Sequence, residues 1–86
     1  MPRVSEFYGI VIAMYYNDHL PPHFHARYGS ARASMRIDTL EVLSGELPRR
    51  ALVLVREWAA QHRGALLRDW ALAMLAQPLD PIPPLS

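Results

Sequence analysis

The chain has 86 residues, 51% of them apolar and 20% charged, which is the size and composition of one small globular domain. Nine Arg, no Lys and eight Asp and Glu give a formal charge of +1, a balance that excludes a dedicated nucleic-acid-coating protein. There is no Cys, which excludes disulfide bonds and thiolate metal ligands, and no apolar run reaches the ~20 residues of a membrane helix, so we expect a cytoplasmic protein without a membrane partner.

The first predicted element is a strand over residues 7–16. This segment is rich in β-branched and aromatic residues and is apolar at both odd and even positions. Such a pattern is typical of a strand that is covered on both faces of its sheet. Residues 17–22 end the strand, because Asn and Asp favour turns and the two prolines lack the N–H that a sheet requires. The isomers of Pro21 and Pro22 do not follow from the sequence.

A β-hairpin is predicted next. Residues 23–28 and 31–38 both alternate in polarity and enclose Gly29-Ser30, which favours a two-residue type II′ loop. This loop fixes the register, and one face then pairs Phe24 with Met35, Ala26 with Ala33, and Tyr28 with Ala31. The opposite face pairs His23 with Arg36, His25 with Ser34, and Arg27 with Arg32. We call the polar residues of this second face the His/Arg face: His23, His25, Arg27, Arg32 and Arg36.

Two helices are predicted in the second half of the chain. A short strand over residues 40–43 is expected to end at Ser44-Gly45, and Pro48 favours the first position of a helix. Apolar residues then recur at helical spacing in two stripes, separated at Arg63-Gly64. The stripes contain Ala51, Leu52, Val55, Trp58, Ala59 and His62, and then Leu66, Leu67, Trp70, Ala71 and Met74.

The predicted architecture is a single α+β domain over residues 1–86. A small antiparallel sheet, a meander that contains the hairpin, occupies residues 1–45, and the two helices occupy residues 46–76. Residues 77–86 contain four prolines, which exclude regular structure there. The three apolar residues of this segment favour an extended strap that packs on the domain: Leu79, Ile82 and Leu85.

Three motifs resemble a known family. They are Phe7-Tyr8-Gly9-Ile10, Asn17-Asp18-His19-Leu20-Pro21-Pro22-His23-Phe24-His25-Ala26 and Leu47-Pro48-x-Arg50-Ala51-Leu52. The chain resembles the small bacterial proteins grouped as domain of unknown function family 4160, over nearly its whole length. The resemblance implies a cytosolic protein that acts with a small protein encoded beside it, in some cases as part of a toxin–antitoxin unit. It implies no catalytic residues.

The histidine motif is one candidate for a metal site. In a strand, His23 and His25 point to the same face at a repeat of ~6–7 Å, and Asp18 and His19 in the preceding loop could complete the ligand set. A divalent transition metal is therefore one hypothesis, and no other cofactor is expected. The arginines of the same face oppose it, because a cation beside guanidinium groups is repelled.

Anion binding by the His/Arg face is the second hypothesis. Arg27 opposite Arg32 is destabilising in a bare sheet, and a phosphate or an acidic surface would relieve the repulsion. The expected function is a binding component that engages an anionic partner protein, RNA or DNA through His23, His25, Arg27, Arg32 and Arg36. With RNA as the ligand, His23 or His25 could serve as a general base for metal-free cleavage, so enzymatic activity stays open. Self-association through an exposed apolar patch is a third hypothesis.

Overall fold

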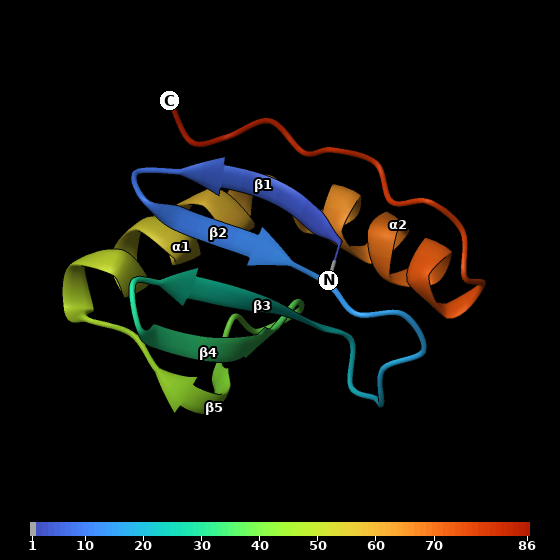
Figure 1. Ribbon diagram of the computed structural model, residues 1–86, viewed down its shortest axis with the longest axis horizontal. Helices are drawn as coiled ribbons and strands as arrows, with labels where there is room; N and C mark the ends of the chain where they lie inside the picture. Colours follow the sequence, from blue (N-terminus) through green and yellow to red (C-terminus); the bar gives the residue numbers. More distant parts are fainter. Residues whose placement is uncertain (1) are drawn as a thin grey trace.

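Five antiparallel strands are followed by two helices (Figure 1). The computed structural model describes residues 2–86. The strands are Arg3–Phe7 (β1), Ile10–Ala13 (β2), His23–Tyr28 (β3), Ala31–Arg36 (β4) and Val42–Glu46 (β5), and the helices are Arg49–Gln61 (α1) and Arg63–Met74 (α2). Each strand pairs with the next one in the chain, so the sheet is a meander. The predicted α+β architecture is confirmed.

Residues 7–16 do not form one strand, contrary to the prediction. Phe7 ends β1, and a tight turn at Tyr8 and Gly9 leads into β2. Both turn residues have positive φ angles, 49° and 79°, as the two central residues of a type I′ hairpin turn require. The turn is hard to predict because Tyr rarely adopts positive φ. All four residues of β2 are buried, which also removes the alternation of a one-sided strand.

The β3–β4 hairpin has the predicted register. Gly29-Ser30 is a two-residue loop with a φ of 60° at Gly29, and all six predicted cross-strand pairs are present. The apolar face is buried at Phe24, Ala26, Ala33 and Met35. Tyr28 differs from the prediction, since 42% of its surface is exposed at the end of the hairpin.

The last strand, β5, lies two to three residues beyond the prediction, and Ser44 and Gly45 are inside it. A Cβ atom on Gly45 would lie 2.2 Å from the carbonyl oxygen of Arg32, and Gly45 has a φ of 72°. Only glycine fits this position. The pairing of β4 with β5 is irregular between Ser34 and Met35. Glycine therefore marks a distortion within the strand and not its end.

Helix α1 covers one face of the sheet and supplies the centre of the core (Figure 1). It begins directly after Pro48, and its buried residues follow the predicted stripe: Ala51, Val55, Trp58 and Ala59. The Trp58 ring lies 5.3 Å from the Phe7 ring and 6.1 Å from the Phe24 ring, between centroids. Burial of these large rings is the main stabilising contribution in the core. Neither helix is drawn across the middle of the opposite face of the sheet (Figure 1), and α2 reaches this face at the start of β3, where Trp70 packs on His23.

The buried face of helix α2 overlaps the predicted stripe in part. The helices are separated at His62, one residue before the predicted break. Leu67 and Ala71 are exposed, whereas Asp69 and Ala73 are buried together with the predicted Leu66 and Trp70. Across residues 2–86, neither helix combines the length and the apolar character that spanning a membrane would need.

Residues 77–86 form the predicted extended strap, which runs alongside β1 (Figure 1). The Ile82 N–H donates a hydrogen bond to the Val4 carbonyl at 2.7 Å, and the Trp58 indole N–H donates to the Pro83 carbonyl at 2.8 Å. Ile82 is buried, and Leu79 and Leu85 pack against the core. The strap therefore binds both to β1, at the edge of the sheet, and to Trp58, at the centre of the core.

A buried carboxyl group ties α2 to this strap. Asp69 is only 1% exposed, and its Oδ1 accepts a hydrogen bond from the Asp80 N–H at 2.9 Å. Its Oδ2 has no hydrogen-bond partner among the described residues. Burial raises the pKa of Asp69, and the hydrogen bond from Asp80 only partly opposes this effect. The folded protein therefore holds a proton on Asp69 more tightly than the unfolded chain does.

The first prediction concerns the core. Trp58→Ala is expected to lower the free energy of unfolding by about 3–5 kcal/mol, because it removes a fully buried ring and its hydrogen bond to the strap. Val53→Ala, at an exposed position of the same helix, is the matched control and is expected to change it by about 0.5 kcal/mol or less. Urea unfolding measures both. Equal stabilities for the two variants would contradict the placement of the core.

The second prediction concerns pH. Because the pKa of Asp69 is higher in the folded protein than its ordinary value of 3.8, the free energy of unfolding should fall as pH rises from about 4 through the folded-state pKa. Asp69→Asn keeps an acceptor for the Asp80 N–H but carries no charge, so this decline should be smaller in the variant.

Urea unfolding of both proteins from pH 4 to pH 7 measures the difference. Glu46→Gln is the control, since the Glu46 side chain is exposed and is not among the groups that shift the pKa of Asp69. Identical pH profiles for Asp69→Asn and the parent would show that Asp69 is not responsible.

Candidate functional site

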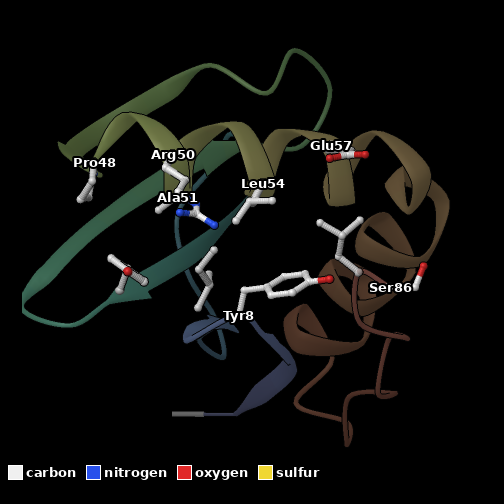
Figure 2. A pocket seen from close by; sticks show the side chains of 10 residues that line it. Tyr8, Pro48, Arg50, Ala51, Leu54, Glu57 and Ser86 are labelled. Carbon is white, nitrogen blue, oxygen red and sulfur yellow. The ribbon is translucent and has the colours of Figure 1, made fainter.

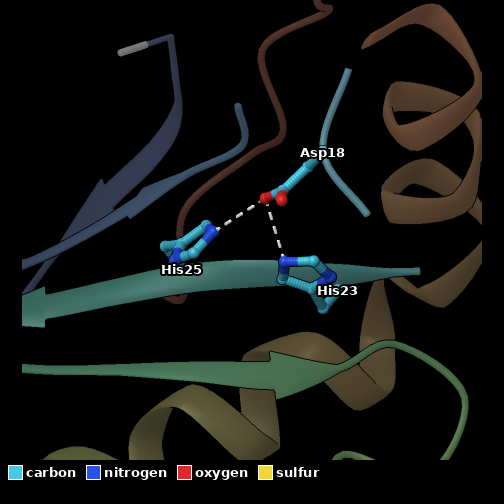
Figure 3. A group of neighbouring side chains, drawn as sticks. All are labelled: Asp18, His23 and His25. Atoms are coloured by element: carbon cyan, nitrogen blue, oxygen red, sulfur yellow. Dashed lines mark hydrogen bonds and ion pairs between the residues drawn. The ribbon is translucent and has the colours of Figure 1, made fainter. Parts of the chain in front are cut away.

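The candidate site lies where the loop of residues 14–22 returns to the sheet at the start of β3 (Figure 3). The Asn17 N–H donates to the Ala73 carbonyl of α2 at 3.3 Å, which ties the loop to the helix. The Asp18 Oδ1 accepts a hydrogen bond from the His19 N–H at 2.8 Å. The peptide bond between Leu20 and Pro21 is cis. With Oδ1 held by its own loop, Asp18 directs Oδ2 toward β3.

Asp18, His23 and His25 converge on one point (Figure 3). The Asp18 Oδ2 lies 3.0 Å from the His23 Nε2 and 3.2 Å from the His25 Nε2. One potential ligand atom from each of the three residues lies within 4.8 Å of the other two. The predicted register of β3 places both imidazoles on one face, and the loop brings the carboxylate to them. We call these three residues the Asp/His cluster.

Aromatic rings hold the two imidazoles of the Asp/His cluster in place. His23 is 2% exposed, and its ring centroid lies 5.2 Å from that of Trp70 in α2 and 5.3 Å from that of His19. His25 is partly buried, and its ring lies edge-on to Tyr15 at 4.3 Å. Packed on these sides, neither imidazole can turn freely away from Asp18.

The Pro21 carbonyl determines which nitrogen of His23 carries a proton. The His23 Nδ1 lies 2.7 Å from the Pro21 oxygen, and because a carbonyl oxygen only accepts, Nδ1 must donate. In neutral His23 the other nitrogen, Nε2, then bears a lone pair, and it faces a carboxylate oxygen of Asp18 at 3.0 Å. Two electron-rich atoms at this distance need a cation between them, which is either a second proton or a metal ion.

The electrostatics favour the ligand forms of Asp18 and His25. Burial alone would raise the pKa of Asp18, but the His19 N–H and the imidazoles of His25 and His23 outweigh it and hold the pKa below its usual value. Burial lowers the pKa of His25, although Asp18 opposes this shift. At neutral pH these shifts leave a carboxylate beside a neutral imidazole, which are the forms that bind metal ions.

The other predicted ligand, His19, is placed differently. Its side chain is 85% exposed, and its Nε2 is 3.7 Å from the Asp18 Oδ1, on the other oxygen of the carboxylate. His19 therefore packs on His23 but stands outside the group of three potential ligand atoms. The structure brings together three of the four residues considered for a metal site.

The arginines of the His/Arg face separate into two groups. The Arg36 Nε donates to the Asp38 Oδ1 at 2.6 Å, so its charge is compensated beside it. Arg27 and Arg32 lie further along the hairpin and line a small hollow together with His25. The Asp18 carboxylate stands next to the histidines, which counters the repulsion that the arginines would exert on a cation there.

Two components of the site had no signal in the sequence. Trp70 stands in a helical stripe, which indicates a buried residue but not that it packs against His23. The Pro21 carbonyl belongs to a loop whose path the sequence leaves open. Both contacts depend on where α2 and the loop come to lie in space.

A second cavity lies away from the Asp/His cluster, at the other end of β3 (Figure 2). It has a volume of about 620 Å³ and is bounded by Tyr8, Tyr28, α1 and the strap. Arg50 and Glu57 are the charged residues that line it. None of the residues predicted for the site contributes to this cavity, so the candidate site is defined by its ligand atoms and not by cavity size.

Comparison with known proteins gives a family and no function. The family described as Domain of unknown function (DUF4160) matches residues 9–71, more than half of the chain. This range contains Asp18, His23, His25 and Trp70. No curated protein and no solved structure matches the chain. The chain therefore belongs to the DUF4160 family, as its motifs predicted.

Proposed function

We propose that this DUF4160 domain is a small cytosolic protein that binds one divalent transition metal ion through Asp18, His23 and His25. The observation that carries the proposal is the position of one carboxylate oxygen, 3.0 and 3.2 Å from two imidazole nitrogens.

The distances match those of ligands that share one ion. Metal–nitrogen and metal–oxygen bonds to zinc are about 2.0–2.2 Å long, so two ligand atoms are about 2.9 Å apart at a right angle and about 3.3 Å apart at a tetrahedral angle. The two separations from the Asp18 Oδ2 lie within this interval. Each of the two imidazole nitrogens therefore stands at the distance from the Asp18 oxygen that two ligands of one ion would have.

The surroundings of His23 also match those of a metal ligand. A ligating imidazole usually donates its other N–H to a carbonyl or a carboxylate, which fixes the tautomer and the ring orientation. The Pro21 carbonyl provides this partner for His23 at 2.7 Å. Trp70 on one side of the ring excludes water from it.

The ligand types indicate the class of metal. Two imidazoles and one carboxylate suit Zn²⁺, Fe²⁺, Co²⁺ or Ni²⁺, whereas Mg²⁺ and Ca²⁺ prefer oxygen ligands alone. Three protein ligands leave at least one position on the ion for water or another molecule, and an open position is typical of reactive sites. The proposed site is therefore suited to binding a further ligand on the ion.

The third prediction tests this proposal. Untagged protein, freed of metal with a chelator, is expected to bind one Co²⁺ or Zn²⁺ per chain. Because the ion binds the folded state, the melting temperature of the protein should rise when metal is added. The free energy of unfolding should increase by about 2.7 kcal/mol at a metal concentration of 100 times Kd. Asp18→Asn, His23→Ala and His25→Ala should each abolish stoichiometric binding and the shift in melting temperature. Isothermal titration calorimetry and the visible spectrum of Co²⁺ measure the binding.

His19→Ala is the matched control for this experiment. It removes an imidazole from the same loop, but one that is exposed and outside the Asp/His cluster. Binding should be retained in this variant. If no divalent ion stabilises the parent, a proton holds Asp18 and His23 together, the cluster is a structural ion pair, and the proposal is wrong.

A second candidate function is binding of an acidic partner protein through Arg27 and Arg32. The two residues stand directly opposite each other, and within residues 2–86 no carboxylate oxygen lies within 4.0 Å of either guanidinium group. Like charges placed opposite in a sheet are destabilising, so carboxylates of a partner would relieve them. A small protein encoded next to this chain, as in a toxin–antitoxin unit, is the partner that the family resemblance implies.

The fourth prediction tests this candidate. Co-expressed with that neighbour, the chain should form a complex that the double variant Arg27→Ala with Arg32→Ala weakens and that rising salt dissociates, because exposed charges are screened within ~8–10 Å. Size-exclusion chromatography and calorimetry measure the complex. A complex of unchanged affinity in the double variant would exclude these arginines as the contact.

A further inference from the structure

A small hollow adjoins the Asp/His cluster on the face of the sheet that α1 does not cover. Its volume is about 40 Å³, and residues of β2, β3 and β4 line it together with Tyr15. Val11 and Ala13 of β2, both buried, lie beside Arg27 and His25 in the register and form a floor of small side chains. The longer side chains of Arg27, Arg32, His25 and Tyr15 stand around this floor.

The hollow has a positive charge that the described residues leave uncompensated. Arg27 and Arg32 are direct cross-strand neighbours. Glu46 is the register partner of Arg32 on β5, and Glu6 is the register partner of Val11 on β1. Among residues 2–86, Glu46 forms no ion pair within 4.0 Å, and Glu6 is engaged by Arg3 at 3.1 Å. Arg27 and Arg32 therefore line a common hollow, and among residues 2–86 neither forms an ion pair within 4.0 Å with Glu46 or with another carboxylate.

His25 connects the hollow to the Asp/His cluster. Its Nε2 faces Asp18, while its ring forms part of the wall of the hollow. Arg27 follows two residues later on the same face of β3, at a distance of about 6–7 Å along the strand. A group of a few ångströms in size that enters the hollow can thus contact a metal ion at His25 on one side and the guanidinium groups on the other.

Size and charge together define the class of ligand. A volume of about 40 Å³ holds about three water molecules, since each needs ~10–15 Å³ by the same measure. This space suits the oxygens of one tetrahedral oxyanion better than the flat surface of a protein. Arg binds phosphate through paired hydrogen bonds, and a metal ion with an open position takes a phosphate oxygen as a ligand.

We infer that the hollow binds a phosphate group that bridges the metal ion of the Asp/His cluster and the guanidinium groups of Arg27 and Arg32. This inference rests on the metal site proposed above. The Asp18 carboxylate would oppose a phosphate in the metal-free protein, so phosphate should bind more tightly when the ion is present. By reciprocity, phosphate should tighten metal binding by the same factor as metal tightens phosphate binding.

The fifth prediction uses inorganic phosphate as the probe and the Co²⁺-loaded, untagged chain as the protein. Phosphate is expected to bind to the loaded protein, at least tenfold more tightly than to the metal-free protein. Calorimetry gives the affinities, and the ³¹P relaxation rate reports whether the phosphorus lies next to the paramagnetic Co²⁺. Arg27→Ala and Arg32→Ala should each weaken phosphate binding about tenfold or more, as expected for loss of a hydrogen bond to a charged group.

Matched variants separate the inference from the fold and from the metal site. Arg49→Ala removes an exposed arginine of α1 and should leave phosphate binding unchanged. Arg27→Gln keeps much of the partly buried stem of Arg27 and removes its charge, so it covers the case in which Arg27→Ala does not fold. The Arg27 and Arg32 variants must still bind Co²⁺, because this binding shows that the Asp/His cluster is intact.

The outcomes distinguish the two proposals. If Co²⁺ binds but phosphate does not, or if phosphate binds equally well without metal, the inference is overturned and the metal site stands. If no metal binds, both are overturned. Methyl phosphate should bind like inorganic phosphate, because the hollow lies on the face of the sheet that α1 does not cover. Binding of a short RNA or an acidic partner protein through Arg27 and Arg32, independently of metal, would contradict the inference. It would show that the two arginines belong to a surface for a macromolecule.

Discussion

The arrangement of the site depends on the contacts of one buried group, the imidazole of His23. Its ring packs on Trp70 of α2, Nδ1 donates to the Pro21 carbonyl, and Nε2 faces Asp18. An unpaired buried polar group costs about 1–3 kcal/mol, so both nitrogens need their partners. The loop of residues 14–22 must therefore keep its path over the start of β3. Through this one residue, the sheet, the loop and α2 are held in a fixed relation.

The two faces of the sheet differ in composition: one is packed into the apolar core, and the other carries polar side chains. One face carries the large apolar side chains that pack on α1 and Trp58, and the strap closes this layer through Ile82 and Pro83. The other face bears small residues on β2 and the polar side chains of β3 and β4, and α2 contacts it at the start of β3 through Trp70. Because the rigid core positions the strands, the two imidazoles of β3 have fixed positions, and the loop that carries Asp18 completes the Asp/His cluster.

Local patterns in the sequence predicted the β3–β4 hairpin and the buried stripe of α1. The β3–β4 register follows from Gly29-Ser30 and from the strict alternation of side chains in a strand. Prediction failed where a residue serves a distant contact. Gly45 looks like a strand end but makes room for the Arg32 carbonyl, and Asp69 lies outside the predicted apolar stripe of its helix yet is buried and accepts the N–H of Asp80. The turn at Tyr8 and Gly9 was hidden because β2 is buried on both faces.

For the candidate site, the sequence by itself determined that His23 and His25 share one face of a strand, because side chains two residues apart in a strand point the same way. It also placed the arginines on that face, which argued against a cation. Only the tertiary structure decided that the Asp18 carboxylate lies beside these histidines, with a single oxygen reaching both imidazoles. That position depends on the loop being tied to Ala73 and on Trp70 packing against His23. These contacts join residues about 50 positions apart in the chain, and neither spacing nor propensity encodes which distant surfaces meet when the core closes.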